Sequence, residues 1–156
     1  MKKSNDNSPQ KKADYHCDTK NLNYVSSITP QKALAWLQAD PYTQLIDVRT
    51  RAELDWVGRP LIPKNQYFWI EWLRYPGGTP NGKFIEQLKE QTPLDIPVLF
   101  LCRSAARSEE AANAAAQAGF MNAYNVLEGF EGEKDHKGHR KSINGWCFQG
   151  LPWIGA

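Results

Sequence analysis

The residues with the clearest chemical potential lie in one loop, which begins at Cys102. Cys102 follows the apolar run Val98–Leu101 and precedes a segment of helical composition, so we expect its thiol at the carboxyl end of a strand and beside a helix N-terminus. Unpaired backbone N–H groups and the positive end of the helix dipole favour the thiolate there, which is the reactive form. Arg103 and Arg107 add positive charge. The loop therefore predicts a nucleophile that shares its site with an anionic substrate.

A free cysteine at a strand end is more often a small buried apolar residue than a nucleophile. Here two arginines flank the cysteine with no acidic residue between them, and Ser104 and Ser108 lie beside the same turn. Like charges repel, so such a cluster is costly unless it meets an anion. We therefore interpret Cys102 as the catalytic residue.

Helix and strand signals before this loop indicate how it is positioned. Thr29–Pro30 predicts a helix start, and Asp40–Pro41 predicts the end of that helix. The nearly continuous apolar run Gln44–Val48 predicts a buried strand. It leads into Thr50–Glu53, a capping box that predicts a short helix to about Trp56.

The remaining elements predict an α/β fold. Residues 58–81 are rich in proline and glycine and predict a loop. The other expected elements are an edge strand at Tyr67–Ile70, a helical pattern at Phe84, Ile85 and Leu88, a strand at Pro97–Leu101, a helix from about Arg107 to Ala118 that Gly119 stops, and a strand at Ala123–Val126. This order favours a parallel sheet with helices on both faces. Residues 1–21 are polar and predict a flexible tail, which leaves residues 22–156 as a single domain.

Composition excludes several classes of function. The chain has 156 residues and a net charge of +2, and its scattered Lys and Arg residues argue against nucleic-acid binding. No apolar run is long enough to cross a membrane, and Met1–Lys3 is followed by polar residues rather than by the apolar stretch of a signal peptide. Cys17, Cys102 and Cys147 are odd in number and widely spaced. They predict no disulfide framework and favour a cytoplasmic protein.

The segment Cys102–Ser108 resembles the active-site loop of rhodanese-type sulfurtransferases, whose pattern is Cys, four residues, Arg and often Ser. Other segments are similar to that family in the same order. These are Asp47–Arg49 with Glu53, Leu127–Gly129, Gly145–Trp146 and Gly150–Trp153. The resemblance covers the chain from about residue 25 to its end and is typical of single-domain members.

This resemblance implies a three-layer, rhodanese-like fold around a sheet of five parallel strands, and a persulfide intermediate. Cys102 would take sulfur from a donor such as thiosulfate and pass it to cyanide, a thiol or an acceptor protein. The backbone of five residues would cradle that sulfur: Arg103, Ser104, Ala105, Ala106 and Arg107. Asp47, Arg49 and Ser108 would support the loop, and Asp47 is a candidate ion-pair partner of Arg107. We expect no cofactor and no metal.

The chain departs from the family pattern at three places. Ala105 stands where many members have glycine, and alanine would be strained there if the loop requires a positive φ. Gly58–Pro63 replaces a frequent Gly-His-Ile-x-Gly-Ala segment, which changes one wall of the expected pocket. Phe130 follows Gly129 where a second glycine is frequent.

Two other functions compete with sulfur transfer. A related branch of this fold acts as phosphatases or arsenate reductases with a loop one residue longer, and the shorter spacing from Cys102 to Arg107 fits a single sulfur atom better than a tetrahedral oxyanion. A partner-binding sulfur carrier with little turnover is the second. It would use exposed aromatic residues among Trp69, Trp72, Tyr75, Trp146 and Trp153, which we interpret instead as core and pocket lining.

Two further readings of the histidines and cysteines carry less weight. His136, His139 and Cys147 lack a fourth ligand at suitable spacing for zinc. Cys17 lies in the expected tail and is only a weak candidate for a resolving cysteine.

Overall fold

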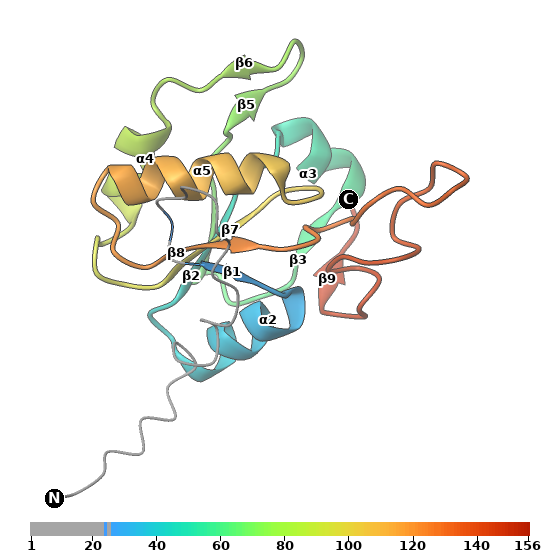
Figure 1. Cartoon of the computed structure of the whole chain (residues 1–156), viewed down its shortest axis with the longest axis horizontal. Coiled ribbons are helices and arrows are strands. Elements are labelled where there is room, and N and C mark those ends of the chain that lie inside the picture. Colours follow the sequence, from blue (N-terminus) through green and yellow to red (C-terminus); the bar gives the residue numbers. More distant parts are fainter. Residues whose placement is uncertain (1–23, 25) are drawn as a thin grey trace, which may run out of the picture.

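The computed structural model describes Tyr24 and residues 26–156, and it confirms the expected α/β fold (Figure 1). The expected tail, residues 1–21, lies outside the described residues. In chain order the elements are β1 (Ser26–Ile28), α2 (Pro30–Ala39), β2 (Gln44–Asp47), α3 (Arg51–Val57), β3 (Arg59–Pro60), β4 (Tyr67–Trp69), β5 (Leu73–Arg74), β6 (Thr79–Pro80), α4 (Phe84–Gln91), β7 (Val98–Leu101), α5 (Ala106–Gln117), β8 (Ala123–Val126) and β9 (Trp153–Ile154).

Five strands form a parallel sheet in the order β1-β8-β7-β2-β4. The register of β2 and β7 places Asp47 opposite Leu101, and the amide of Val48 donates to the carbonyl of Leu101 at 2.8 Å. Both strands therefore end at the same edge of the sheet. The segments that follow them, which carry Arg49 and Cys102, leave that edge side by side.

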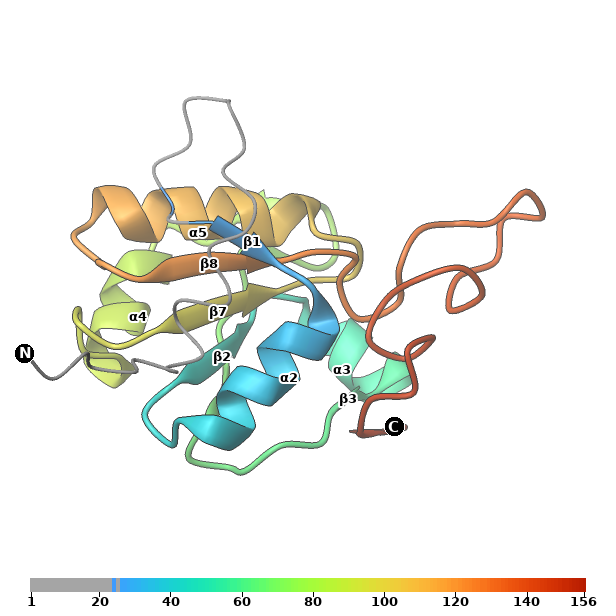
Figure 2. The same cartoon turned by 60° about the horizontal axis from the view of Figure 1, so that its bottom comes forward.

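Helices cover both faces of the sheet (Figure 2), and the side chains of the sheet alternate between two buried layers. Ile46 and Phe100 pack on the face that α4 and α5 cover. Leu45 and Leu99 pack on the opposite face with α2 and the segment around Trp146. Complete burial of each such side chain contributes about 1.5–3 kcal/mol relative to exposure. These two layers hold the strands, and so the strand ends, in fixed positions.

The helix starts follow the expected local signals. The side chain of Thr29 accepts a hydrogen bond from the amide of Lys32 at the start of α2, where Pro30 is the first helical residue. The capping box at α3 is complete, because Thr50 accepts from the amide of Glu53 and the Glu53 carboxylate accepts from the amide of Thr50. α3 buries none of its residues, so it lies on the surface beside the carboxyl edge of the sheet.

The sequence pattern did not identify β1, the outer strand of the sheet. Two of its three residues are Ser26 and Ser27, which do not have the apolar or β-branched character of an expected strand. Pairing with β8 buries both serines. Tertiary contact, and not local propensity, makes this strand.

The C-terminal segment returns to the divergent segment Gly58–Pro63 through the antiparallel pair β3–β9. Gly58 has φ +106°, and a Cβ atom there would overlap the carbonyl of Ile154. Glycine at this position therefore allows the C-terminal segment to lie against the end of α3. Among the described residues, none of the helices combines the length and apolar character that crossing a lipid bilayer requires.

Candidate active site at the Cys102 loop

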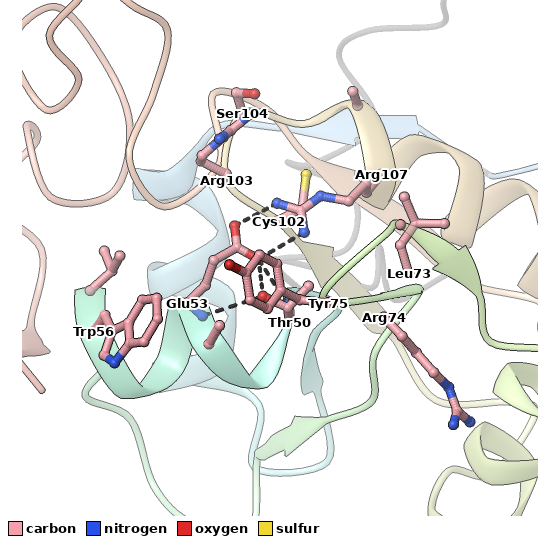
Figure 3. A pocket seen from close by; sticks show the side chains of 14 residues that line it. Thr50, Glu53, Trp56, Leu73, Arg74, Tyr75, Cys102, Arg103, Ser104 and Arg107 are labelled. Atoms are coloured by element: carbon pink, nitrogen blue, oxygen red, sulfur yellow. Dashed lines mark hydrogen bonds and ion pairs between the residues drawn. The ribbon is translucent and has the colours of Figure 1, made fainter.

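Cys102 lies at the base of a cavity of about 570 Å³ (Figure 3). Its walls come from α3, from the hairpin of β5 and β6, and from the loop between β7 and α5. Cys102 is 1% exposed, and it directly follows β7 as the sequence predicts. The cavity thus brings together one buried thiol and three separate segments of the chain.

Loop carbonyls next to Cys102 face the turn that follows β8. The amide of Phe130 donates to the Cys102 carbonyl at 2.8 Å, and the amides of Glu131 and Gly132 donate to the Arg103 carbonyl at 3.0 and 3.1 Å. Gly129 has φ +71°, and a Cβ atom there would overlap the backbone of Arg103. The close approach of these two turns therefore requires glycine.

The backbone amides of the Cys102 loop, unlike its carbonyls, have no hydrogen-bond partners in the described chain. Within the described part of the chain, no acceptor takes the backbone N–H groups of residues 103 to 107. These groups precede or begin α5, where the helix dipole adds partial positive charge. Successive free amides in a turn form a concave site for an anion.

Ala105 takes the left-handed conformation, with φ +79° and ψ −8°. The loop therefore requires a positive φ at this position, and the strain expected for alanine is confirmed, because its Cβ meets a steric cost that glycine avoids. The conformation ends the loop and starts α5 at Ala106. The chain accepts about 1–2 kcal/mol of local strain to shape the turn.

The hydroxyl of Ser108 lies beside the thiol. Its Oγ is 3.2 Å from Cys102 Sγ, 3.1 Å from the Ala105 carbonyl oxygen and 2.6 Å from Asn125 Oδ1. A hydroxyl carries one proton, so only one of these groups receives it at a time. Asn125, on β8, was not expected, although a polar residue inside a buried strand is a signal that could have found it.

Arg107 pairs with Glu53 and not with Asp47, so the expected Asp47–Arg107 pair is wrong. Its guanidinium donates to both carboxylate oxygens of Glu53, at 2.8 and 2.7 Å. Burial by itself would raise the pKa of Glu53, but hydrogen bonds from Arg107 and Thr50 lower it to about 2. Burial would lower the pKa of Arg107, and Glu53 raises it instead. This pair joins α3 to the start of α5 across the cavity.

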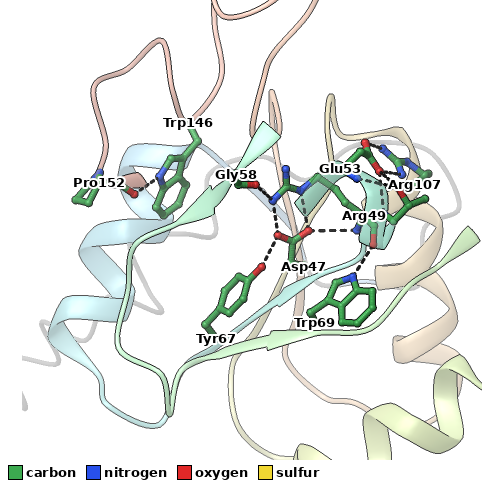
Figure 4. Close-up of polar contacts among 10 residues, drawn as sticks. Asp47, Arg49, Glu53, Gly58, Tyr67, Trp69, Arg107, Trp146 and Pro152 are labelled. Atoms are coloured by element: carbon green, nitrogen blue, oxygen red, sulfur yellow. Dashed lines mark hydrogen bonds and ion pairs between the residues drawn. The ribbon is translucent and has the colours of Figure 1, made fainter. Parts of the chain in front are cut away.

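Asp47 is already occupied by the residue two positions along the chain (Figure 4). The guanidinium of Arg49 donates to both Asp47 oxygens, at 2.9 and 2.7 Å, and both side chains are 0% exposed. Tyr67 adds a third donor at 2.7 Å. Burial and the Asp47 carboxylate raise the pKa of Tyr67. Burial would lower the pKa of Arg49, but Asp47 raises it.

Phe130, the departure from the family pattern in the turn after β8, lies against this ion pair. The centre of the Arg49 guanidinium is 4.3 Å from the centroid of the Phe130 ring. Within the described residues, Nη1 of Arg49 has no hydrogen-bond acceptor, and the face of an aromatic ring offers it favourable electrostatic contact. Arg49 also donates to the Gly58 carbonyl at 2.9 Å. The cluster therefore fixes β2, the end of α3 and the turn after β8 together.

Comparison with known proteins places this geometry in a family. The model of the Rhodanese-like domain matches residues 29–136, which span four of the five strands of the sheet (β2, β4, β7 and β8), α2 to α5 and the whole Cys102 loop. The chain belongs to the rhodanese-like domain family.

Similar proteins extend the rhodanese-like match beyond that range. Rv0390 from M. tuberculosis is 42% identical with a TM-score of 0.78, over 85% of this chain and 99% of that one. The polysulfide-sulfur transferase homodimer from Wolinella succinogenes is 25% identical with a TM-score of 0.59, over 93% of this chain and 83% of that one. The RP600 homolog of Rickettsia rickettsii is 35% identical over 130 residues, 83% of this chain and 97% of that protein. The family and the transferase support a sulfurtransferase-type activity in general.

Cys147, His136 and His139 do not line the cavity of this rhodanese-like site. Cys147 is half-buried, and burial raises its pKa to about 11. Cys17 lies outside the described residues. Across Tyr24 and residues 26–156, no three His, Cys, Asp or Glu side chains are grouped to hold a metal ion, and His136 and His139 are exposed.

The expected division of the aromatic residues between core and pocket holds only in part, because Trp69 and Trp72 are half-buried, Trp153 is 38% exposed, and none of the three lines the cavity. Trp146 is fully buried, and its indole N–H donates to the Pro152 carbonyl at 2.8 Å. Tyr75, at the tip of the hairpin, is 62% exposed and lines the cavity. Trp56, which the sequence reasoning did not consider for the site, also lines the cavity and is 77% exposed.

Proposed function

We propose that this protein is a sulfurtransferase that moves a sulfane sulfur from a donor such as thiosulfate to cyanide or a thiol through a persulfide of Cys102. The observation that carries this proposal is the position of one buried thiol beside five backbone amides that have no acceptor in the described chain. Those amides suit a small anionic sulfur, and the thiolate is the form of cysteine that attacks sulfur.

In the first half-reaction, the Cys102 thiolate attacks the outer sulfur of thiosulfate. A bond forms between the two sulfur atoms, the sulfur–sulfur bond of the donor breaks, and sulfite leaves with its electron pair. The terminal sulfur of the persulfide then carries negative charge, which the amides of residues 103 to 107 stabilise. In the second half-reaction, cyanide attacks that terminal sulfur, and thiocyanate leaves as the Cys102 thiolate re-forms.

Side chains around the loop have distinct roles in this proposal. The Ser108 hydroxyl is 3.2 Å from the sulfur. When Cys102 is a thiolate, this hydroxyl donates its hydrogen bond to the sulfur instead of to the neutral oxygens of Ala105 and Asn125. Arg103 is exposed and has no ion-pair partner in the described residues, so it meets the incoming anion. Arg107, held by Glu53, orders the loop. Asp47 and Arg49 brace the neighbouring strand end.

Thiocyanate formation from thiosulfate and cyanide tests the proposal. Cys102→Ser should abolish turnover, whereas Cys147→Ser should keep most of it, because the Cys147 thiol does not line the cavity. Cys17→Ser should also keep most of the turnover, because the proposed mechanism uses Cys102 alone. An aryl phosphate should give no comparable rate. Phosphate release without sulfur transfer would move the protein to the phosphatase branch, and normal thiocyanate formation by Cys102→Ser would overturn the mechanism.

A further inference from the structure

The cavity above Cys102 is much larger than an inorganic donor requires. Its volume is about 570 Å³. Thiosulfate would fill on the order of 150 Å³, at about 30 Å³ per heavy atom. Cavities of several hundred Å³ with few polar groups are typical of organic ligands. Space therefore remains for a body attached to the reacting sulfur.

Trp56 differs from every other tryptophan in the chain. The other five each have a hydrogen bond or a ring contact with another described residue: Trp36, Trp69, Trp72, Trp146 and Trp153. Trp56 has neither, lies in the last turn of α3 and is 77% exposed. A single exposed aromatic residue is ordinary on a protein surface. This one lines the cavity that contains the nucleophile.

Tyr75 reaches the same cavity from a different segment. It follows β5 at the tip of the hairpin, is 62% exposed, and has no side-chain partner among the described residues. Asn81 holds the base of this hairpin, since its side chain donates to the Glu71 carbonyl at 2.8 Å and accepts from Arg74 at 3.1 Å. A fixed hairpin base thus presents an unpartnered ring to the pocket.

The two rings lie away from the sulfur, beside an ion pair whose charges are already matched. In Figure 3 the rings of Trp56 and Tyr75 lie on the same side of Cys102, with the Glu53 carboxylate between them and the guanidinium of Arg107, its partner, close to the sulfur. The amides of the loop and Arg103 supply the anion-binding part. A ligand that fits both parts has a charged sulfur end and an apolar, preferably aromatic, body.

We propose that Trp56 and Tyr75 bind the organic body of the donor, so that the enzyme prefers an organic sulfane-sulfur anion to inorganic thiosulfate. This inference rests on the sulfur transfer proposed above. An aryl thiosulfonate represents the class: the Cys102 thiolate attacks its terminal sulfur, the bond between the two sulfur atoms breaks, and the aryl sulfinate leaves with the electron pair. The protein persulfide is the same for every donor, so the rings affect only the first half-reaction.

Benzenethiosulfonate and methanethiosulfonate test this proposal, with cyanide as the acceptor and thiosulfate as a third donor. The two thiosulfonates have the same reacting group, but only benzenethiosulfonate carries an aromatic ring. For Trp56→Ala with Tyr75→Ala, the ratio of kcat/KM for the phenyl donor to that for the methyl donor should fall about tenfold. Comparing each ratio with that of the wild type removes the intrinsic reactivity of the donors. The circular dichroism spectrum of the variant reports that it is folded.

Tyr42→Ala is the matched control, because Tyr42 is 74% exposed and does not line the cavity. It should leave the donor ratio unchanged. An unchanged ratio in the folded double variant would overturn the role of the rings and leave the sulfurtransferase proposal standing. No turnover of any of the three donors by the wild type would instead overturn the sulfurtransferase proposal, and this inference with it.

Discussion

Polar groups are paired at the end of one strand and unpaired at the end of its neighbour. After β2, Asp47 and Arg49 are completely buried, and the carboxylate accepts from Arg49, from its amide and from Tyr67. After β7, Cys102 is buried beside backbone amides that have no acceptor in the described chain. The position in the fold is the same, since both strands end at one edge of the sheet.

This difference distinguishes groups that support the fold from groups that can bind a substrate. Internally paired charges at a strand end cannot bind a substrate without breaking their own contacts, so they fix the backbone. Amides left unpaired beside a thiol keep their capacity for a ligand. Arg107 stands between the two cases, because Glu53 occupies its guanidinium while both residues line the cavity.

Asp47→Ala should have the largest effect on stability. It leaves the Arg49 charge buried without its carboxylate, and breaking such a pair costs about 3–5 kcal/mol. Urea denaturation measures the loss. Asp55→Ala removes the partner of Arg51 in an exposed pair and should change stability by no more than about 1 kcal/mol. Equal losses of stability in the two variants would show that the buried Asp47–Arg49 pair does not stabilise the fold more than an exposed pair does.

The stability that the Glu53–Arg107 ion pair contributes should decrease at acid pH. The folded protein holds the pKa of Glu53 at about 2, below the ordinary 4.5. The stabilisation is therefore complete above about pH 4.5 and is lost as the pH falls towards 2. It amounts to no more than about 3 kcal/mol. Denaturation at several pH values should show a shallower acid decline for Glu53→Gln, and identical slopes would contradict this assignment.

Arg107→Ala should lower kcat/KM for thiosulfate by roughly ten- to a hundredfold, because the Cys102 loop loses the charged hydrogen bonds to Glu53 that order it, each worth about 1.5–3 kcal/mol. The variant also leaves the Glu53 carboxylate unpaired beside the anion site. Arg107→Lys should recover little, since a point charge does not replace the planar fork that meets both oxygens of Glu53. Arg103→Ala should cost less. Equal losses for the two alanine variants would contradict the division of roles between these arginines.

Ala105→Gly should have the smallest effect. Glycine removes the steric strain at φ +79° but adds chain entropy to the unfolded state, so stability should rise by no more than about 1 kcal/mol. Ala114→Gly, inside α5, should instead lose about 1 kcal/mol. Thermal denaturation of both variants measures the contrast, and a clear loss in Ala105→Gly would be inconsistent with a strained alanine.

Local signals were sufficient for most of the fold. The strands at β2, β7 and β8 were predictable because their apolar runs are buried on both faces, and the starts of α2 and α3 because their caps are encoded within four residues. β1 was not predictable, since pairing with β8 buries its serines. The spacing of the loop predicted the place of Cys102 for the same local reason.

Contacts between distant segments were beyond the sequence. Nothing local shows that Glu53, which completes a capping box, also reaches Arg107 across 54 positions. The proposed Asp47–Arg107 pair failed because Arg49 lies close enough to use both oxygens of Asp47. Trp56 was missed because one aromatic residue on a short helix gives no sign that the hairpin places Tyr75 at the same cavity.

The most direct test of the central claim is the intact mass of the protein after incubation with thiosulfate and removal of excess donor. The wild type should gain the mass of one sulfur atom, lose it on addition of cyanide, and share this behaviour with Cys147→Ser. Cys102→Ser should gain nothing. A wild-type protein without added mass, or a Cys102→Ser variant that still gains one sulfur, would contradict a persulfide at Cys102.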